Sequence, residues 1–280
     1  MGLNDEYGNI SASQEAAMVR AVLIAFLAVL CPVVVISQTS VQYGGTRPVQ
    51  LQDGGTRQVL ESIVVPPKAN SPFVTTLHTE WVRGSSDNGT ITFVNDRRIA
   101  RDSSGRIYQE RWLLVPKNGK VNSQMNAVQI SDPTEHTLYT CFLLVSPKVC
   151  TLTTYSPTTS TIYNVVGAPA GPLPNDAGYV AREDLGHQTL LGVDTVGSRE
   201  IVTYNPGVIG NDQKINLTRE YWYAEQLGIN LLSKRSDPSF GTQVFTVTEI
   251  NLSEPDVHLF ELPQGFKVVD HRQSDPPAVD

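Results

Sequence analysis

Two cysteines are the residues whose spacing most directly indicates chemistry. Cys141 and Cys150 lie within one apolar stretch, TCFLLVSPKVC, and the turn-forming residues Ser146-Pro147-Lys148 stand between them. Two short apolar segments around a turn favour a hairpin, and a disulfide can join its strands. Zinc is the competing interpretation, but no histidine or second cysteine pair stands nearby at zinc-like spacing. The spacing therefore predicts a structural disulfide, with free or redox-active thiols as the alternative.

The sequence carries no signature of a known catalytic or cofactor site. The Gly-x-Ser-x-Gly elbow of serine hydrolases does not occur, and neither do the phosphate-binding patterns GxxxxGK[ST] and GxGxxG. The histidines show no HxH or HExxH spacing; they are His78, His136, His187, His258 and His271. We therefore expect a protein that is not an enzyme, with no catalytic residue, no metal ligand and no cofactor.

Two carboxylates stand close to tryptophans, a mixture that glycan-binding sites often contain. Glu80 precedes Trp81, and Glu110 lies two residues before Trp112. Paired carboxylates hydrolyse glycosidic bonds in many enzymes. Solvated strand faces that flank core aromatics are the simpler interpretation, and an envelope hydrolase is the least supported of the functions considered.

Aromatic side chains supply the candidate ligand contacts. Tyr221, Trp222 and Tyr223 are consecutive, so in a strand the two tyrosines point to one face and Trp222 to the other. One of these faces belongs to the core, and the other can present a platform to a ligand. The candidate ligand-binding residues are thus these three together with Trp81 and Trp112.

An arginine-rich segment supplies the candidate contact with an anion. Arg97, Arg101 and Arg106 flank an expected turn at residues 102–105. A symmetric hairpin around that turn sets Arg97 opposite Glu110, a favourable pair, and Arg101 opposite Arg106, an unfavourable one. A solvated face with cross-strand ion pairs is the preferred interpretation, and a grip on an anionic head group is the alternative.

The pattern beyond residue 66 predicts β-strands joined by turns. Residues 73–82 alternate between two faces and are rich in β-branched and aromatic side chains, and Asn88-Gly89 is the strongest hairpin signal in the chain. Helical periodicity is not convincing in any window of this part. Further expected strands are 90–94, 127–131, 137–145, 149–155, 188–193, 199–204, 218–224, 230–236 and 242–250. We therefore predict a mainly β fold, an antiparallel sheet built of consecutive hairpins.

The N-terminal part of the chain predicts export. Residues 21–37 are uncharged and apolar, Arg20 precedes them, and Val35 and Ser37 fit the small-residue rule for cleavage. A secretory signal has an apolar centre of roughly 7 to 15 residues and a membrane span needs about 20, so this run lies between the two. We predict a signal peptide at residues 18–38, with an anchor helix in the inner membrane as the alternative and membrane association through residues 21–37.

The remaining segments complete the expected organisation. Residues 1–17 are acidic where an export signal should begin basic, so the true start is expected at Met18. The expected divisions after the signal are a flexible Gly-rich lead-in at 39–66, a single antiparallel β domain at 67–270 with a Pro/Gly loop at 167–178, and a disordered tail at 271–280. The net charge of −7 disfavours a nucleic-acid partner and suits the periplasm or the outside of the cell.

Several stretches resemble an uncharacterised family of exported bacterial proteins: TEWVRGSSDNGTITFVNDRRIARDSSGRIYQERWLLVP, ISDPTEHTLYTC, LLGVDTVGSRE, EYWYAEQLGINLLSKRSDPSFGTQVFTVTEI and EPDVHLFELPQGFKV. Roughly the last 90 residues are loosely similar to envelope proteins of the lipoprotein-carrier type (LolA-like). That resemblance implies a large curved sheet, an open half-barrel whose concave face takes up acyl chains, with a lipid or a lipoprotein as partner. The chain departs from the carriers by its Pro/Gly loop and by lacking an early amphipathic helix.

These observations together predict a non-catalytic exported protein of the cell envelope that binds a lipid or another apolar ligand on a concave β-sheet. The alternative is a membrane-anchored structural or protein-interaction module with no small-molecule ligand. The two differ in whether residues 21–37 are removed from the mature protein and in whether the sheet carries a ligand.

Overall fold

The computed structural model describes residues 63–156 and 167–272, and all of these belong to one compact unit, residues 45–280. The expected signal or anchor at 18–38, the residues before it and most of the lead-in lie outside the described part. Among the described residues, no helix has the length and apolar character needed to cross a bilayer.

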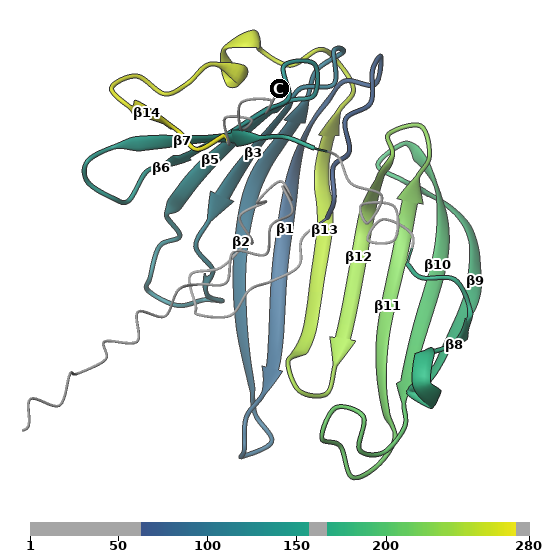
Figure 1. Ribbon diagram of the computed structural model, residues 1–280. Helices are drawn as coiled ribbons and strands as arrows, with labels where there is room; N and C mark the ends of the chain where they lie inside the picture. Colours follow the sequence, from purple (N-terminus) through teal and green to yellow (C-terminus); the bar gives the residue numbers. More distant parts are fainter. Residues whose placement is uncertain (1–62, 157–166, 273–280) are drawn as a thin grey trace, which may run out of the picture. The chain divides into compact units, whose positions relative to one another are not determined.

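The described chain is almost entirely β-structure (Figure 1). The first run of strands is β1 (Phe73–Gly84), β2 (Thr90–Arg101), β3 (Ile107–Trp112), β4 (Val115–Pro116), β5 (Met125–Asp132), β6 (Thr137–Phe142) and β7 (Val149–Thr154). The second run is β8 (Gly171–Pro172), β9 (Gly178–Leu190), β10 (Val193–Tyr204), β11 (Ile215–Ala224), β12 (Ile229–Asp237), β13 (Gly241–Asn251) and β14 (Lys267–Asp270). Two short 3-10 helices interrupt them, η1 (Pro174–Asp176) and η2 (Val257–Phe260).

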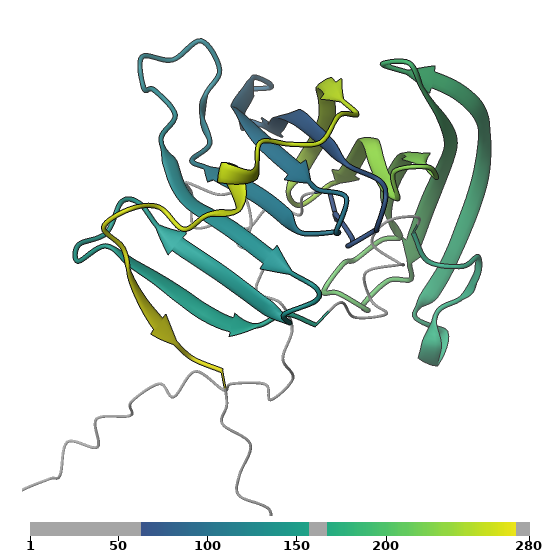
Figure 2. The same ribbon diagram turned by 90° about the horizontal axis from the view of Figure 1, so that it is seen from above.

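One sheet contains all these strands, in the order β14-β7-β6-β5-β3-β2-β1-β13-β12-β11-β10-β9-β8, with β4 beside β2. The view from above shows that the sheet is curved (Figure 2). The two ends of this order do not pair, so the sheet is open. The predicted mainly β sheet of consecutive hairpins is therefore confirmed. Two features were not predicted: β1 pairs with β13 and so joins the two runs of hairpins, and β14 lies parallel to β7.

One face of the sheet holds the main apolar core. β1 alternates strictly, with Phe73, Leu77 and Trp81 buried on one side and their neighbours half-buried on the other. We call the side of these three residues the inner face and the opposite side the outer face. The inner core draws on both runs of strands: it includes Ile99, Ile107, Ile229, Leu231, Phe245 and Val247. Hydrophobic side chains of distant sequence segments thus share one buried layer.

The core also corrects the expected boundary of the lead-in. Ile63 and Val65 are each 2% exposed and pack in the inner core, although the flexible lead-in was expected to reach residue 66. Two apolar side chains at alternate positions pack this segment onto the sheet. We call residues 63–72 the lead segment.

The C-terminal chain covers part of the outer face. Leu259, Phe260 and Leu262 pack against a smaller apolar cluster that contains Tyr108 and Val128. The chain between β13 and β14 therefore crosses the outer face of the first run of strands before it reaches β7. This path explains why β14 arrives parallel to β7, as a crossover and not as a hairpin.

One expected strand is wrong, because residues 188–193 contain a turn. β9 ends at Leu190, β10 begins at Val193, and these two residues pair directly. Leu191 and Gly192 between them have φ angles of 51° and 78°, as a two-residue hairpin turn requires. Leu191 is apolar, so the sequence has no typical turn signal at this position. In the structure its side chain projects into solvent, as a turn residue can.

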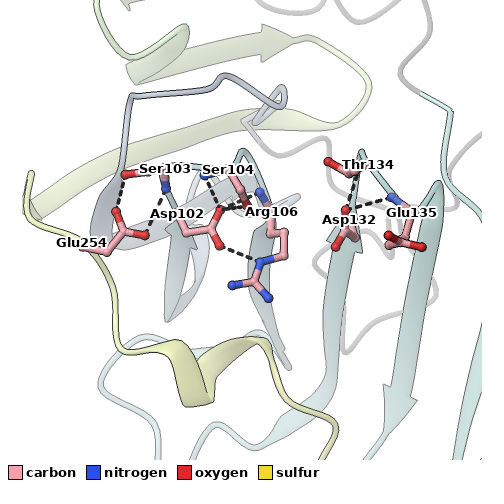
Figure 3. Close-up of polar contacts among 8 residues, drawn as sticks. All are labelled: Asp102, Ser103, Ser104, Arg106, Asp132, Thr134, Glu135 and Glu254. Atoms are coloured by element: carbon pink, nitrogen blue, oxygen red, sulfur yellow. Dashed lines mark hydrogen bonds and ion pairs between the residues drawn. The ribbon is translucent and has the colours of Figure 1, made fainter.

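The expected register of the β2–β3 hairpin is wrong by one residue. Ala100 pairs with Tyr108, and Arg98, not Arg97, forms the ion pair with Glu110, at 3.2 Å. The reason lies in the turn, where the Asp102 carboxylate accepts hydrogen bonds from the backbone N–H groups of Ser104 and Arg106 (Figure 3). These bonds fix a turn that is not symmetric.

A buried guanidinium ties the lead segment to the sheet. Arg101, at the end of β2, is 0% exposed and donates to the carbonyl oxygens of Pro66, Ser71 and Leu227 at 2.9, 3.0 and 2.7 Å. It also donates to Ser71 Oγ and lies over the Phe73 ring, with Cζ 4.9 Å from the ring centroid. Burial lowers the pKa of Arg101 to about 10, so the side chain stays protonated at neutral pH.

The predicted disulfide is confirmed. Cys141 of β6 and Cys150 of β7 are directly opposite each other, both fully buried, and joined by a bond between their sulfur atoms. A covalent link here fixes the register of the hairpin next to the parallel strand β14.

Replacing both cysteines by alanine should lower the free energy of unfolding by about 2–3 kcal/mol, because the unfolded chain gains the entropy that the closed loop removes. Urea denaturation measures the change. The unaltered protein under reducing conditions is the control and should lose a similar amount. Equal stability of variant and oxidised protein would contradict the prediction.

Replacing Arg101 by leucine should lower the free energy of unfolding by at least about 3 kcal/mol, because three buried carbonyl oxygens lose their donors. The control is Arg272→Gln, which removes an exposed ion pair with Asp270 and should change stability by less than about 1 kcal/mol. Denaturant unfolding of the two variants compares them. Similar losses would show that Arg101 has no special role.

Candidate functional site

The arginines expected to meet solvent are held inside the protein or in its turns. Arg97 and Arg101 are 1% and 0% exposed, so the interpretation as a solvated charged face is wrong for both. Alternation along β2 explains this, because both residues point to the inner face with Ile99. Arg106 donates from Nε to the Asp102 carboxylate at 2.6 Å (Figure 3). Its guanidinium also lies over the ring of Phe260. The structure thus gives Arg101 and Arg106 contacts that stabilise the fold.

The Asp102 turn illustrates how burial and hydrogen bonds compete. Burial by itself would raise the pKa of the Asp102 carboxyl, but hydrogen bonds from Ser104 and Arg106 outweigh it and hold that pKa below its ordinary value. Glu254 reaches the same turn from the C-terminal chain, where it accepts from Ser103 (Figure 3). This cluster therefore fastens the C-terminal chain to the β2–β3 turn.

A polar network occupies the inner face of the first run of strands. Arg97 and Arg111 both donate to Gln109 Oε1, at 3.5 and 3.0 Å, and Arg111 Nε donates to Gln129 Oε1 at 3.0 Å. Gln129 in turn donates to Thr140 Oγ1 at 3.3 Å. Two buried guanidinium groups thus lie among amides on a face that also carries the apolar core.

A small cavity lies beside this network. Its wall contains polar and apolar residues; the polar ones are Gln109, Gln129, Ser131 and Tyr155, and the apolar ones are Val65, Ile107 and Leu138. Burial raises the pKa of Tyr155 to about 12, so its hydroxyl is a neutral donor at physiological pH. The cavity combines neutral polar groups with hydrocarbon.

The structure separates the five aromatic ligand candidates. Trp81 and Tyr221 lie on the inner face, 1% and 3% exposed. Trp112 and Trp222 lie on the outer face, where each donates its indole N–H to a carboxylate two residues earlier. Burial raises the pKa of Tyr223, whose hydroxyl interacts with the charge of Arg101. The aromatic residues therefore do not form one platform.

The carboxylates considered for glycan chemistry also have structural contacts on the outer face. Glu110 is 4% exposed and accepts from Tyr108, Trp112 and Arg98. Glu80 accepts from Lys117 at 3.3 Å. Among the described residues, no group of three His, Cys, Asp or Glu side chains is arranged to hold a metal ion.

The second run of strands carries a row of charged side chains in register on the inner face. Arg182 of β9 pairs with Glu200 of β10, Glu200 with Arg219 of β11, and Arg219 with Arg235 of β12. The same row continues through Gln243 of β13 to Trp81 of β1. Cross-strand partners share a face, so these side chains are neighbours on the inner surface. We call the four charged residues the inner charged row.

Glu200 is the centre of this row. It is 1% exposed, and its carboxylate oxygens lie 3.9 Å from a guanidinium nitrogen of Arg182 and 3.9 Å from one of Arg219. The carboxylate also accepts from the backbone N–H of Ala168, while Arg182 donates to the carbonyl of the same residue at 2.9 Å. Both backbone polar groups of one residue are thus bound by side chains of the sheet.

Gly167 makes this contact sterically feasible. Its φ angle is +82°, and a Cβ at this position would lie 2.7 Å from Arg182 Nη1, 2.7 Å from Glu200 Oε2 and 3.1 Å from the Tyr221 ring. Only glycine brings the backbone so close to the charged row without strain. The first two residues of the expected Pro/Gly loop, Gly167 and Ala168, are therefore docked on the inner face.

The outer face of the same strands carries a different row. Glu183, Arg199, Glu220 and Lys234 follow one another across β9 to β12 with alternating sign. Arg199 bonds to Glu183 at 2.8 Å and to Glu220 at 3.2 Å, and these bonds raise the pKa of Arg199. We call these residues the outer charged row.

Sequence reasoning missed the inner charged row altogether. Arg182, Glu200, Arg219 and Arg235 lie on four strands, and nothing in their local sequence distinguishes them from ordinary surface charges. Alternation could have placed Arg219 on the same face as Tyr221, two residues away. The cross-strand register was needed to bring the four together.

Comparisons with known proteins give only loose similarities. No protein-family model matches the chain, and no curated protein sequence matches it. The structure of the Pseudomonas aeruginosa MucA/MucB complex matches with a TM-score of 0.36 and 14% identity, over 71% of this chain and 58% of that one. The chain thus spans less than two thirds of the chain that it matches there.

Two lipoprotein-related structures also match. The lipoprotein LppX of Mycobacterium tuberculosis has a TM-score of 0.26 and 10% identity, over 64% of this chain and 90% of that one. A Vibrio parahaemolyticus domain of the outer membrane lipoprotein-sorting type has a TM-score of 0.16 and 7% identity, over 65% and 86%. The loose similarity to lipoprotein carriers that the sequence indicated is therefore found among solved structures. At these TM-scores it carries no argument about function.

Replacing Gly167 by alanine should destabilise the protein more than the same change at Gly207. Both glycines have left-handed φ angles, +82° and +84°, which cost a non-glycine residue about 1 kcal/mol or more, but a Cβ at Gly207 meets no atom within 4 Å. The collision with the charged row at Gly167 should add about 1–3 kcal/mol. Thermal and urea unfolding of both variants measure the difference, and equal losses would contradict the docking contact.

Proposed function

We propose that the protein is a non-catalytic, exported protein of the cell envelope that binds a lipid-like ligand on the inner face of its sheet. The observation that carries the proposal is the composition of this face in an open, curved sheet. Hydrocarbon from β1, β12 and β13 lies beside charged and amide side chains of the same strands. A ligand with an apolar chain and a polar group fits such a surface.

The apolar part of the face supplies the affinity. Leu77, Trp81, Leu231 and Phe245 form a continuous layer with the lead segment, in which Ile63 and Val65 occupy part of the surface. Each methylene group that an acyl chain buries against such a layer contributes about 0.8 kcal/mol. An acyl chain would thus bind by the same contacts that hold Ile63 and Val65.

The proposal of a non-catalytic role follows from where the titratable groups lie. The carboxylate of Glu110 accepts several hydrogen bonds from neighbouring side chains, and His78 bonds to Asp96 on the outer face at 2.7 Å. Groups held in this way orient other side chains and do not face a shared substrate position. Binding without chemistry is the function that such a surface supports.

A second candidate function, binding of a polypeptide, is favoured by one observation. Ala168 shows how the inner face holds the backbone of one residue, through Glu200 at its N–H and Arg182 at its carbonyl. An extended segment of another protein could use equivalent contacts. This corresponds to the protein-interaction alternative, with no small-molecule ligand.

Mass spectrometry of molecules extracted from the protein, purified from its own compartment, tests the proposal. We expect acyl chains in about stoichiometric amount, because each methylene group that such a chain buries against the apolar layer favours the bound state. An unrelated exported protein of similar charge, purified in parallel, is the control for carried-over membrane lipid. Recovery of a bound peptide, or of no molecule beyond the control, would overturn the lipid proposal.

A further inference from the structure

The connections between adjacent strands lie at two opposite ends of the sheet. Among the described strands, every adjacent pair except β14 and β7 is antiparallel, so successive connections alternate between the two ends. Figure 1 shows the β1–β2, β10–β11 and β12–β13 connections together at its lower edge. We call this the β1–β2 end, and its connections are 85–89, 117–124, 143–148, 205–214 and 238–240. The β2–β3 end is the opposite one, with the turns 102–106, 133–136, 191–192 and 225–228.

Exposed apolar side chains gather in the connections of the β1–β2 end. Four of the five connections carry at least one, and these residues are Val121, Leu144, Val145, Val208, Ile209 and Phe240. At the β2–β3 end, three of the four described turns carry none, and the β9–β10 turn has Leu191. Leu252 and Val257 lie on the crossover after β13, not in a turn between adjacent strands. Turns are usually rich in Gly, Pro, Asn, Asp and Ser, so the apolar residues of the β1–β2 end need an explanation.

The β10–β11 loop bonds its own backbone while it exposes two apolar side chains. Asn211 Oδ1 accepts from the backbone N–H of Ile209 at 3.1 Å. Its Nδ2 donates to the carbonyl oxygens of Asn205 and Gln213 at 2.9 and 2.6 Å. Val208 and Ile209 are nonetheless 42% and 53% exposed. Backbone groups that have partners within the chain can leave water at a low cost, so this loop is suited to an apolar environment.

The β12–β13 turn holds Phe240 in a similar way. The N–H of Phe240 donates to the carbonyl oxygen of Asp237 at 3.1 Å, and its carbonyl oxygen accepts from the indole N–H of Trp81 at 2.6 Å. The Asp237 carboxylate also accepts from the N–H of Ser239 at 2.8 Å. These bonds fix the backbone of the turn, and the aromatic residue remains exposed at its tip.

Lysines accompany the apolar residues. The five connections of the β1–β2 end contain two aspartates and four lysines, Lys117, Lys120, Lys148 and Lys214. Lys117 contacts Glu80 at 3.3 Å, whereas Lys120 stands directly before Val121 and Lys214 ends the β10–β11 loop. The turns of the β2–β3 end contain one arginine and three acidic residues, Asp102, Glu135 and Glu225. In a chain with a net charge of −7, this distribution directs the β1–β2 end toward an anionic surface.

We propose that the β1–β2 end docks on an anionic phospholipid bilayer, with Val208, Ile209 and Phe240 in the interfacial region. Lys120 and Lys214 lie at the phosphate groups. Apolar and aromatic side chains enter this region of a bilayer, and lysines near it add attraction to anionic lipids. A bilayer accommodates apolar residues that stand on separate connections, whereas a protein partner requires a contiguous complementary surface. The inference goes beyond the proposed function, because it concerns the surface that meets the membrane and not the ligand of the inner face.

A tryptophan reporter in the full chain tests the insertion of the turn. Phe240→Trp and Leu191→Trp are the reporter and its matched control, since both original residues are 48% exposed and they lie at opposite ends. The vesicles contain equal amounts of phosphatidylcholine and phosphatidylglycerol with brominated acyl chains, which quench tryptophan fluorescence. Relative to the unaltered protein, we expect additional quenching in Phe240→Trp and none in Leu191→Trp. A retained N-terminal anchor would hold both variants on the vesicles alike, so the difference reports the turn itself. Equal quenching of the two variants, or none in Phe240→Trp, would overturn the proposal.

Further substitutions in the Phe240→Trp protein identify the groups that provide the affinity, measured by vesicle titration of the quenching. Val208→Ser together with Ile209→Ser should weaken binding at least about tenfold, because apolar side chains no longer enter the bilayer. Lys120→Gln should weaken it about fivefold at low salt and less at high salt. The control Leu191→Ser should leave it unchanged, and a loss as large as that of the double variant would contradict the docking surface.

Thermal unfolding shows whether these side chains are structural. The double variant at positions 208 and 209 should melt at the same temperature as Leu191→Ser, because the bonds of Asn211 involve only the backbone of the loop. A lower melting temperature of the double variant would overturn the assignment of Val208 and Ile209 to docking.

The docking surface and the proposed function can fail separately. If the reporter is quenched but the purified protein carries no acyl chains, the docking surface stands and the lipid ligand is wrong. If the protein carries acyl chains and the reporter is not quenched, the ligand stands and the docking surface is wrong. A protein partner for the β1–β2 end also predicts a reporter that vesicles do not quench.

Discussion

A buried guanidinium is one of the groups that hold the lead segment against the sheet. Arg101 stands at the end of β2, and its donors reach carbonyl oxygens of Pro66, Ser71 and Leu227. The last of these belongs to the β11–β12 turn, which the sequence separates from β2 by most of the domain. A charge that is costly to bury is retained because these oxygens would otherwise lack donors. The same segment also places Ile63 and Val65 in the inner core.

The two faces of the sheet carry different combinations of side chains. On the outer face, charges alternate in sign and aromatic N–H groups meet carboxylates, so each group has a complementary neighbour. The inner face combines hydrocarbon with guanidinium groups, two of which oppose each other at Arg219 and Arg235.

Patterns of short range could be predicted from the sequence, and patterns of register could not. The alternation of residues 73–82, the Asn88-Gly89 turn and the disulfide depend on neighbouring residues, and the structure contains all three. The prediction of the β2–β3 register was wrong because one side chain, that of Asp102, sets an asymmetric turn. The turn at Leu191 was not predicted because backbone φ angles, and not polar residues, define it.

The sequence by itself determined a mainly β chain with alternating faces, since side-chain alternation has a period of two residues whatever the partner strand is. Only the tertiary structure decided which faces meet: it paired β1 with β13, buried Arg97 and Arg101, and aligned Arg182, Glu200 and Arg219 with Arg235. Local propensity carries no information about the offset between strands. A shift of one residue in that offset exchanges the inner and the outer charges, so the candidate site exists only in the folded register.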